Sequence, residues 1–288
     1  MGRAFLLLVV LLTATPASAQ VKLAGTFALD GCSERPGWAS FAMLPDWADF
    51  NEAADCSRRT GIRWVLALYG VSLNAPPLAL YHHALAVKAR ADAAGLRVLA
   101  VVPNEEHYEH AFTPGAFPLA GLDPASPADT LAIVHEVQAR ASLTYWIVGV
   151  VFPGVPRVWI TGLFNNNPAY GPALYRPLPS GVDVLAIEAY QPAGWTWAQT
   201  GGLYVGHALA TSPVPVVVIG QGFVHPGDPL WGAGPTEDAV DGFAAALRHP
   251  KVIAGMVFDW KDRANGLRGL VSLPYWRGRF ETALGVRF

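Results

Sequence analysis

The chain has 288 residues, of which 52% are hydrophobic and 15% are charged, and its formal net charge at pH 7 is -2. This length and composition are typical of one globular domain with a large buried core. The near-neutral charge and the lack of any basic run argue against nucleic acid as a partner, because phosphate binding requires clustered lysine and arginine.

The N-terminus has the pattern of a secretory signal peptide. The stretch MGRAFLLLVVLLTATPASAQ contains one basic residue, then a short apolar segment, then Ala17-Ser18-Ala19. This apolar segment is too short to span a bilayer, and no later stretch has the roughly 18 uninterrupted apolar residues that a membrane helix needs. We therefore expect cleavage after Ala19, a secreted or periplasmic protein with no membrane attachment after cleavage, and a single mature domain over residues 20–288.

Short apolar segments alternate with segments of helical character along the rest of the chain. Apolar, β-branched runs predict strands over residues 21–29, 63–70, 96–103, 157–164, 182–190, 214–221 and 252–260. Apolar residues at helical spacing predict helices over residues 45–61, 78–95, 127–141 and 236–249. Nearly apolar strands that alternate with helices are typical of a parallel sheet covered by helices. At this length an α/β fold of the (β/α)8 TIM-barrel type is favoured over a doubly wound sheet.

The predicted strands number one fewer than a barrel needs. Residues 145–152, YWIVGVVF, either continue the helix predicted before them or form the eighth strand, with only PGVP separating them from the next strand.

Cys32 and Cys56 are the only cysteines. In an oxidising compartment an even pair indicates a disulfide. The alternative is two buried small side chains, because Cys56 falls late in the helix predicted over residues 45–61, away from the first strand's end.

Polar residues follow the predicted strands at their carboxyl ends, where TIM-barrel enzymes build their active sites. They are Asp30, Asn104, Glu105, Glu106, Glu188, Tyr190, Gln221, Asp259 and Trp260. Alternation along the strands predicts that Asp30, Glu188 and Tyr190 point into the barrel. After the third predicted strand the alternation favours Glu106 over Glu105, but Pro103 interrupts it, so both remain candidates.

Several carboxyl groups on one rim could perform acid/base chemistry. Crowding raises the pKa of one member and so separates an acid from a base, which is what glycoside hydrolysis requires. We expect Glu105 or Glu106 to act as the acid, and Glu188 or Asp30 as the base or nucleophile. The structural alternatives are that Asp30 caps a helix or braces a loop and that Glu188 pairs with an arginine.

Tryptophans add support for a sugar site. Trp195, Trp197 and Trp231 fall in the loops after these strands, and Trp260 ends the last one. Their flat faces could stack on sugar rings, or they could simply fill the loops.

Motifs for other chemistries are missing. His82-His83 and HYEH bring imidazoles close together, but the chain has no HExxH and no zinc-ligand spacing. It also lacks GxGxxG, GxxxxGKS, GxxxxGKT and GxSxG. We therefore expect no metal and no cofactor.

Over most of its length the sequence resembles the (β/α)8 glycoside hydrolases of clan A. PNEEHY is similar to the Asn-Glu pair that carries that family's acid/base glutamate, VDVLAIEAYQP to its strand ending in an active-site tyrosine, and VFDW to its last-strand tryptophan. The resemblance implies that Glu105 is the acid/base with Asn104 beside it, that Tyr190 lies near the nucleophile, and that Trp260 lies in the sugar site.

The sequence departs from that family at two points. The family's Asn-Glu pair closes its fourth strand, whereas here it follows the third predicted strand. The seventh-strand position of the family's nucleophile glutamate is Gln221, in IGQGF, and a glutamine cannot serve as a carboxylate nucleophile.

Three functions follow from these patterns. The first is an exported glycoside hydrolase acting on a polysaccharide or oligosaccharide, in which Glu188 replaces the nucleophile and Gln221 binds substrate hydroxyls. The second is a catalytically inactive barrel that binds glycans, and the third is a structural envelope protein with no sugar site.

Overall fold

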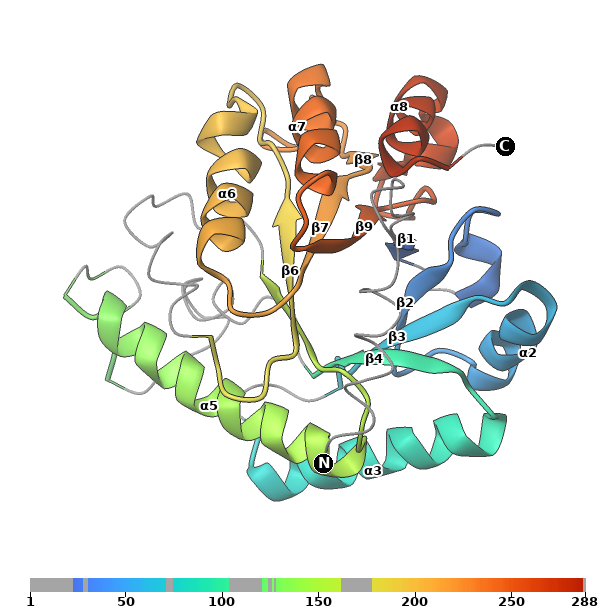
Figure 1. The fold of residues 1–288 in the computed structure, drawn as a ribbon, viewed down its shortest axis with the longest axis vertical. Coiled ribbons are helices and arrows are strands. Elements are labelled where there is room, and N and C mark those ends of the chain that lie inside the picture. Colours follow the sequence, from blue (N-terminus) through green and yellow to red (C-terminus); the bar gives the residue numbers. More distant parts are fainter. Residues whose placement is uncertain are drawn as a thin grey trace.

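Eight parallel strands form the centre of the molecule in a computed structural model, shown in Figure 1. The structure describes residues 23–27, 31–70, 75–103, 121–123, 126, 128–161 and 178–286. The strands are β1 (Leu23–Phe27), β2 (Phe41–Pro45), β3 (Arg63–Ala67), β4 (Val98–Val102), β5 (Val158–Thr161), β6 (Val184–Ala189), β7 (Val216–Gln221) and β9 (Val252–Phe258).

The sheet has the order β4-β3-β2-β1-β9-β7-β6-β5, which is chain order around a circle. A parallel bridge between Val101 and Arg157 joins its two ends, and the Val101 amide donates to the Pro156 carbonyl at 2.9 Å. The sheet therefore closes on itself, and the predicted (β/α)8 barrel is confirmed.

Helices cover the outside of the sheet (Figure 1). They are α2 (Phe50–Thr60), α3 (Pro77–Ala94), α5 (Thr130–Val151), α6 (Gly201–Thr211), α7 (Glu237–Leu247) and α8 (Pro274–Leu284). Short 3-10 turns, η1 (Gly31–Glu34), η3 (Trp197–Gln199) and η4 (Leu270–Ser272), and a two-stranded ribbon of β8 (Phe223–Val224) and β10 (Arg268–Gly269) complete the described elements. None of the described helices has both the length and the hydropathy needed to cross a bilayer.

Local sequence explains several helix ends. The Asp49 carboxylate accepts from the amides of Asn51 and Glu52 at 2.9 and 3.3 Å, which starts α2. Gly61 then ends α2 with a φ of 77°, a conformation that glycine adopts without strain. The Thr236 hydroxyl caps α7 by accepting from the Ala239 amide at 3.1 Å.

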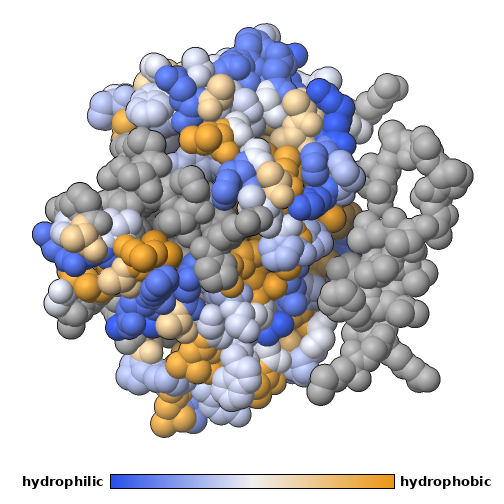
Figure 2. Space-filling model, turned by 60° about the vertical axis from the view of Figure 1, so that its left-hand side comes forward, coloured by the Kyte–Doolittle hydropathy of each residue, from blue (hydrophilic) through white to orange (hydrophobic). Residues whose placement is uncertain are grey.

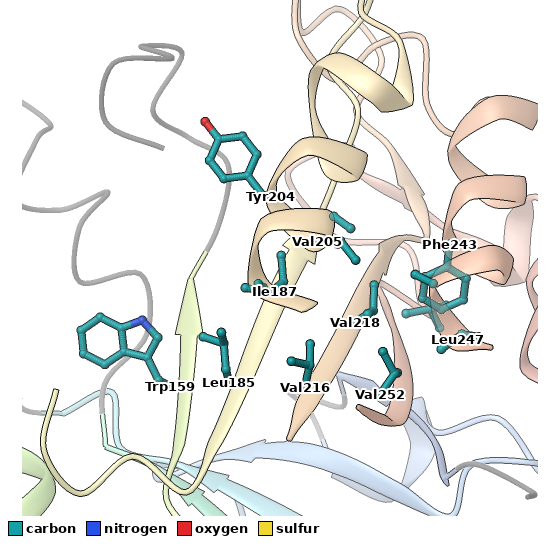
Figure 3. Close-up of a cluster of buried hydrophobic side chains, with 14 of the residues drawn as sticks. Trp159, Leu185, Ile187, Tyr204, Val205, Val216, Val218, Phe243, Leu247 and Val252 are labelled. Atoms are coloured by element: carbon teal, nitrogen blue, oxygen red, sulfur yellow. The ribbon is translucent and has the colours of Figure 1, made fainter. Parts of the chain in front are cut away.

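Successive residues of the strands point alternately into the barrel and toward the outer helices, and each set belongs to its own packed cluster. The interior cluster, which fills the barrel, consists of Phe27, Phe41, Met43, Val65, Ala67, Ala100, Val102, Val158, Ile160, Val184, Ala186, Tyr190, Val217, Ile219, Phe223, Ala254 and Met256. A helix-side cluster lies on the outer face and includes Ala24, Trp159, Leu185, Ile187, Tyr204, Val205, Val216, Val218, Phe243, Leu247 and Val252. Figure 3 shows strand residues of the helix-side cluster meeting side chains of α6 and α7.

The outer surface mixes apolar and polar side chains. Figure 2 shows orange apolar residues scattered among blue hydrophilic ones on the face it brings forward. The exposed large apolar residues include Leu131, Leu143, Trp146 and Val150, all on α5.

One strand was not expected from the sequence. Residues 41–45 form β2, which pairs with β1 and β3 and is buried along its whole length. Residues 145–151 belong to α5, so of the two alternatives for that segment the helical one is correct. Because β2 is the second barrel strand, β4 is the fourth and β7 the seventh.

The predicted orientation of β1 is wrong. Phe27 lies in the interior cluster, whereas Ala24 lies in the helix-side cluster, so the face expected to point inward points outward. Aromatic volume decides this orientation, because the Phe41 ring lies where a Cβ on Gly25 would be and fills the interior beside Phe27. The outward Thr26 hydroxyl donates to the Val257 carbonyl at 3.2 Å.

Cys32 and Cys56 form a disulfide with a Cα separation of 5.8 Å. The turn η1 brings Cys32 back over α2, so the disulfide alternative is the correct one. The bond ties the segment after β1 to the first outer helix.

Candidate active site

Glu188 lies near the carboxyl end of β6, the sixth barrel strand, and its side chain is 2% exposed. Its neighbours at alternate positions, Ala186 and Tyr190, belong to the interior cluster, so Glu188 is on the inward face as the alternation predicts. The Tyr190 hydroxyl donates to Glu188 Oε1 at 3.0 Å. This hydrogen bond orients the carboxyl group.

Aromatic rings surround Tyr190 at the carboxyl end of the barrel, called here the mouth. The Tyr190 ring centroid lies 5.6 Å from Phe223, 6.0 Å from Trp231 and 6.0 Å from Phe258. Phe223 in turn lies 5.6 Å from Phe258 and 6.1 Å from Trp231. Glu188 is therefore a buried carboxyl group close to a largely apolar, aromatic cluster.

Gln221 ends β7 and belongs to a network of amide hydrogen bonds. Its Oε1 accepts from the Gln191 amide at 3.1 Å, and its Nε2 donates to the Phe223 carbonyl at 3.4 Å. Gln191 Oε1 accepts from the Thr236 hydroxyl at 2.9 Å, and Gln191 Nε2 donates to the carbonyl of Trp195. The network connects the seventh strand to the loop after β6 and to the start of α7. Trp195, whose carbonyl takes part in it, is 41% exposed.

Asp259 and Trp260 follow β9, and their described side-chain contacts include Arg263 and Trp38. The Asp259 carboxylate is 2% exposed and pairs with Arg263, at 3.0 Å to Nε and 2.5 Å to Nη2. The peptide bond before Asp259 is cis. Trp260 packs edge to face on Trp38 with the centroids 5.8 Å apart, and both rings lie against the helix-side cluster.

The loop tryptophans separate into two groups. Trp197 lies against Gly201, Gly202 and Gly242, where it fills the space between α6 and α7. Trp231 belongs to the aromatic group at the mouth.

Asp228 holds the loop that carries Trp231. Its Oδ1 accepts from the amides of Trp231 and Leu230 at 3.0 and 2.8 Å. These two hydrogen bonds, that of Trp231 first, lower the pKa of Asp228.

Asp46 is a strand-end carboxylate that the sequence analysis missed. It follows β2 directly, is 4% exposed, and its Oδ2 lies 2.7 Å from His83 Nε2 and 3.0 Å from the Gly70 amide. The signal was present as the apolar run FAMLP followed by an aspartate, but without β2 that aspartate could not be placed at a strand end. No group of three or more possible metal ligands occurs among the described residues.

Asp30, Asn104, Glu105 and Glu106 lie outside the described residues. The strand before Asn104 and Glu105 is nevertheless placed, and it is the fourth of the barrel. The first departure from the glycoside hydrolases is therefore removed, because the Asn-Glu pair follows the fourth strand. The second departure stands, since the seventh strand ends at Gln221.

No family model matches the chain. Its sequence also has no match among curated proteins.

Solved structures are similar to the chain over most of its length. The endo-beta-1,4-mannanase of Cellulomonas fimi, as a double mutant, has a TM-score of 0.60 at 14% identity, covering 92% of this chain and 70% of that one. The beta-glucosidase of Thermotoga maritima in complex with castanospermine has a TM-score of 0.59 at 10% identity, covering 94% and 99%. The GH53 catalytic domain of Ignisphaera aggregans has a TM-score of 0.54 at 13% identity, covering 85% and 86%. Identities this low show the fold alone, and the chain is a (β/α)8 barrel similar in fold to these structures.

Proposed function

We propose that the protein is an exported glycoside hydrolase that cleaves a polysaccharide or oligosaccharide by carboxylate acid/base catalysis. The observation that carries the proposal is Glu188, a buried carboxyl group on the inward face of the sixth strand that accepts a hydrogen bond from Tyr190. The substrate class is supported by the solved structures with this fold, which include a mannanase and a glucosidase.

The mechanism needs a second carboxyl group, which we assign to Glu105 or Glu106 after β4. Only β5 lies between β4 and β6 in the barrel. Strands two apart are separated by about 9.6 Å, and inward side chains shorten that distance. This spacing suits the carboxyl separations of about 5 Å or about 6.5 to 9.5 Å that retaining and inverting glycosidases use.

In this mechanism the residue after β4 protonates the leaving oxygen, and Glu188 acts as nucleophile or activates water. Glu188 thereby takes the role that the resemblance assigns to the end of the seventh strand. Asp30, which follows β1, was the other candidate for this second role, but the corrected orientation of β1 removes the reason to expect its side chain inside the barrel. The amide of Gln221 holds the neighbouring loop, and Asn104 and Trp195 contribute to sugar binding.

Export is part of the proposal. It is supported by the signal pattern of residues 1–19 and by the Cys32–Cys56 disulfide, since disulfides persist in oxidising compartments. Mass spectrometry of the protein recovered from outside the cytoplasm should give an N-terminus at Gln20. Protein that keeps residues 1–19 and stays in the cytoplasm would contradict this part of the proposal.

The test of catalysis is reducing-end release from a broad panel of polysaccharides by the mature protein and its Glu188→Gln variant. We expect release by the wild-type protein, loss of release in the variant, and unchanged thermal unfolding and glycan binding. The matched control is Glu136→Gln, which changes a half-buried glutamate of the outer helix α5 that pairs with Arg140 at 2.7 Å. Release by Glu188→Gln at the wild-type rate would overturn the assignment. The variants Glu105→Gln and Glu106→Gln identify the acid.

A second candidate function is glycan binding without hydrolysis. Gln221 favours it, because the amide stands where the resembling family has its nucleophile and hydrogen-bonds within the protein. No reducing-end release from any polysaccharide, together with binding to at least one of them, would establish this function instead.

A further inference from the structure

Two aromatic rings stack on the β2 and β3 side of the mouth. Trp47 lies in the turn directly after Asp46, and Tyr69 lies shortly after the end of β3. The two ring centroids are 5.2 Å apart and the planes are tilted by 34°. The Trp47 side chain is nevertheless 61% exposed, so most of the indole remains accessible to solvent.

Hydrogen bonds fix the backbone on which these rings stand. The carboxylate of Asp46, next to Trp47, accepts from the amide of Gly70, next to Tyr69, at 3.0 Å. The same oxygen lies 2.7 Å from His83 Nε2, and a Cβ at position 70 would overlap the imidazole ring. The two aromatic residues are therefore joined through their neighbours and held by a side chain of α3.

One guanidinium secures the turn on both sides of Trp47. Arg90 donates to the carbonyl of Asp46 at 2.7 Å and to the carbonyl of Ala48 at 3.0 Å. It also lies over the Phe50 ring at 4.4 Å from the centroid. An exposed indole on so well-anchored a turn loses little conformational freedom when a ligand binds, which favours a binding role.

The rings adjoin the same mouth as Glu188. Tyr69 packs against the interior cluster, as does Trp231. In the closed order of the barrel, three strands separate β2 from β6 on either side, so Trp47 and Glu188 stand on opposite sides of the mouth.

From this arrangement we infer that Trp47 and Tyr69 form a distal carbohydrate subsite. It binds sugar units several positions along the glycan from the glycosidic bond that is cleaved at Glu188. The apolar C–H face of a pyranose ring would lie on the exposed indole, and this contact removes apolar surface of both partners from water. The inference rests on the proposed function and extends it, because it makes the ligand a chain of several sugars rather than a mono- or disaccharide.

The experiment measures binding as a function of chain length in the Glu188→Gln background, so that ligands stay intact. Isothermal titration calorimetry is performed with cello-, manno- and galacto-oligosaccharides from disaccharide to hexasaccharide. We expect Trp47→Ala to weaken hexasaccharide binding by about tenfold and to leave disaccharide binding almost unchanged. Trp47→Tyr, which keeps an aromatic face, should restore most of the affinity.

The matched control is Trp146→Ala on the outer helix α5, where the tryptophan is 63% exposed. It should change the affinity for no oligosaccharide. Equal hexasaccharide affinity in Trp47→Ala and its parent, or an equal loss at every chain length, would overturn the inference while leaving the hydrolase proposal intact. Absence of binding to every oligosaccharide would overturn the inference too, whereas the proposed function fails only on the reducing-end assay.

Discussion

At the scale of single residues, the hydrogen bond between Tyr190 and Glu188 is the contact that best defines the candidate active site. It joins two inward side chains of one strand end at 3.0 Å, in a region where both are buried. Removing one partner of a buried hydrogen bond costs the desolvation energy of the group left behind, so the loss should be measurable.

Replacing Tyr190 by phenylalanine keeps the ring contacts and removes the hydroxyl. We expect unfolding free energy to fall by about 1 to 3 kcal/mol and kcat on a sensitive glycan to fall by about tenfold, because Glu188 loses its orienting donor. The control is Tyr275→Phe, which removes a tyrosine–glutamate hydrogen bond to Glu237 on the outer surface. Equal kcat in wild type and Tyr190→Phe would show that the hydroxyl does not serve the reaction.

Asp228 gives a pH-dependent prediction at the same scale. The amides of Trp231 and Leu230 lower its pKa below the ordinary value of 3.8. A lowered folded-state pKa contributes stability above that ordinary value, and the contribution is lost as the pH falls through the folded pKa. Asp228→Ala should therefore be less stable than wild type in urea at pH 7, and the difference should shrink in acid below 3.8.

The control for this prediction is Asp228→Asn, which keeps an acceptor oxygen and should lose less stability at neutral pH. A stability difference between Asp228→Ala and wild type that stays constant from neutral to strongly acidic pH would contradict the role of the charge.

At the scale of elements, strand alternation predicted β6 correctly and β1 incorrectly. In β6 the inward face carries Val184, Ala186 and Glu188, and Tyr190 supplies its aromatic volume, so alternation and packing agree. In β1 the small residues Ala24 and Thr26 were expected inside, but the interior needs the volume of Phe27. The strand β2 was missed because FAMLP contains no β-branched residue and its last residue, Pro45, is also the first of the helix predicted over residues 45–61.

Glycines of β1 and α6 allow an element-scale test. A Cβ on Gly25 would overlap the buried Phe41 ring, whereas nothing lies within 4 Å of a Cβ on Gly206. We expect Gly25→Ala to lower the unfolding free energy by about 1 to 3 kcal/mol through overpacking. Gly206→Ala, in an exposed helix position, should raise it by about 1 kcal/mol. Urea denaturation measures both, and a stabilised Gly25→Ala would contradict the packing of β1 on Phe41.

At the scale of the whole molecule, strand pairing is extensive around β7 and sparse between β4 and β5, where the barrel has a seam. Strand β7 pairs with β6 on one side and with β9 on the other, the latter with one register shift between Val216 and Val217. Strands β4 and β5, in contrast, meet through the isolated bridge between Val101 and Arg157. Because these two strands are joined by a single described bridge, the seam should open first.

Native-state hydrogen exchange can locate this seam. We expect amides of β5 to exchange at least about tenfold faster than those of β7, because local opening free energies follow the number of structured neighbours. Peptides over residues 158–161 and 216–221 can be compared by mass spectrometry. Equal protection of β5 and β7 would show that the barrel opens only as a whole.

The residue pattern by itself determined the fold class, seven of the eight strands, and Glu188 with Tyr190 on the inward face at a strand end. These features depend on local periodicity, which each segment carries without reference to any other. Tertiary structure alone decided that β2 completes the barrel, that Asn104 and Glu105 follow its fourth strand, and that Asp259 pairs with Arg263. It also decided that Asp46 and His83 hold Trp47 beside Tyr69. These arrangements depend on contacts between segments far apart in the chain, where packed volume and hydrogen-bond partners select among orientations that local periodicity leaves equivalent.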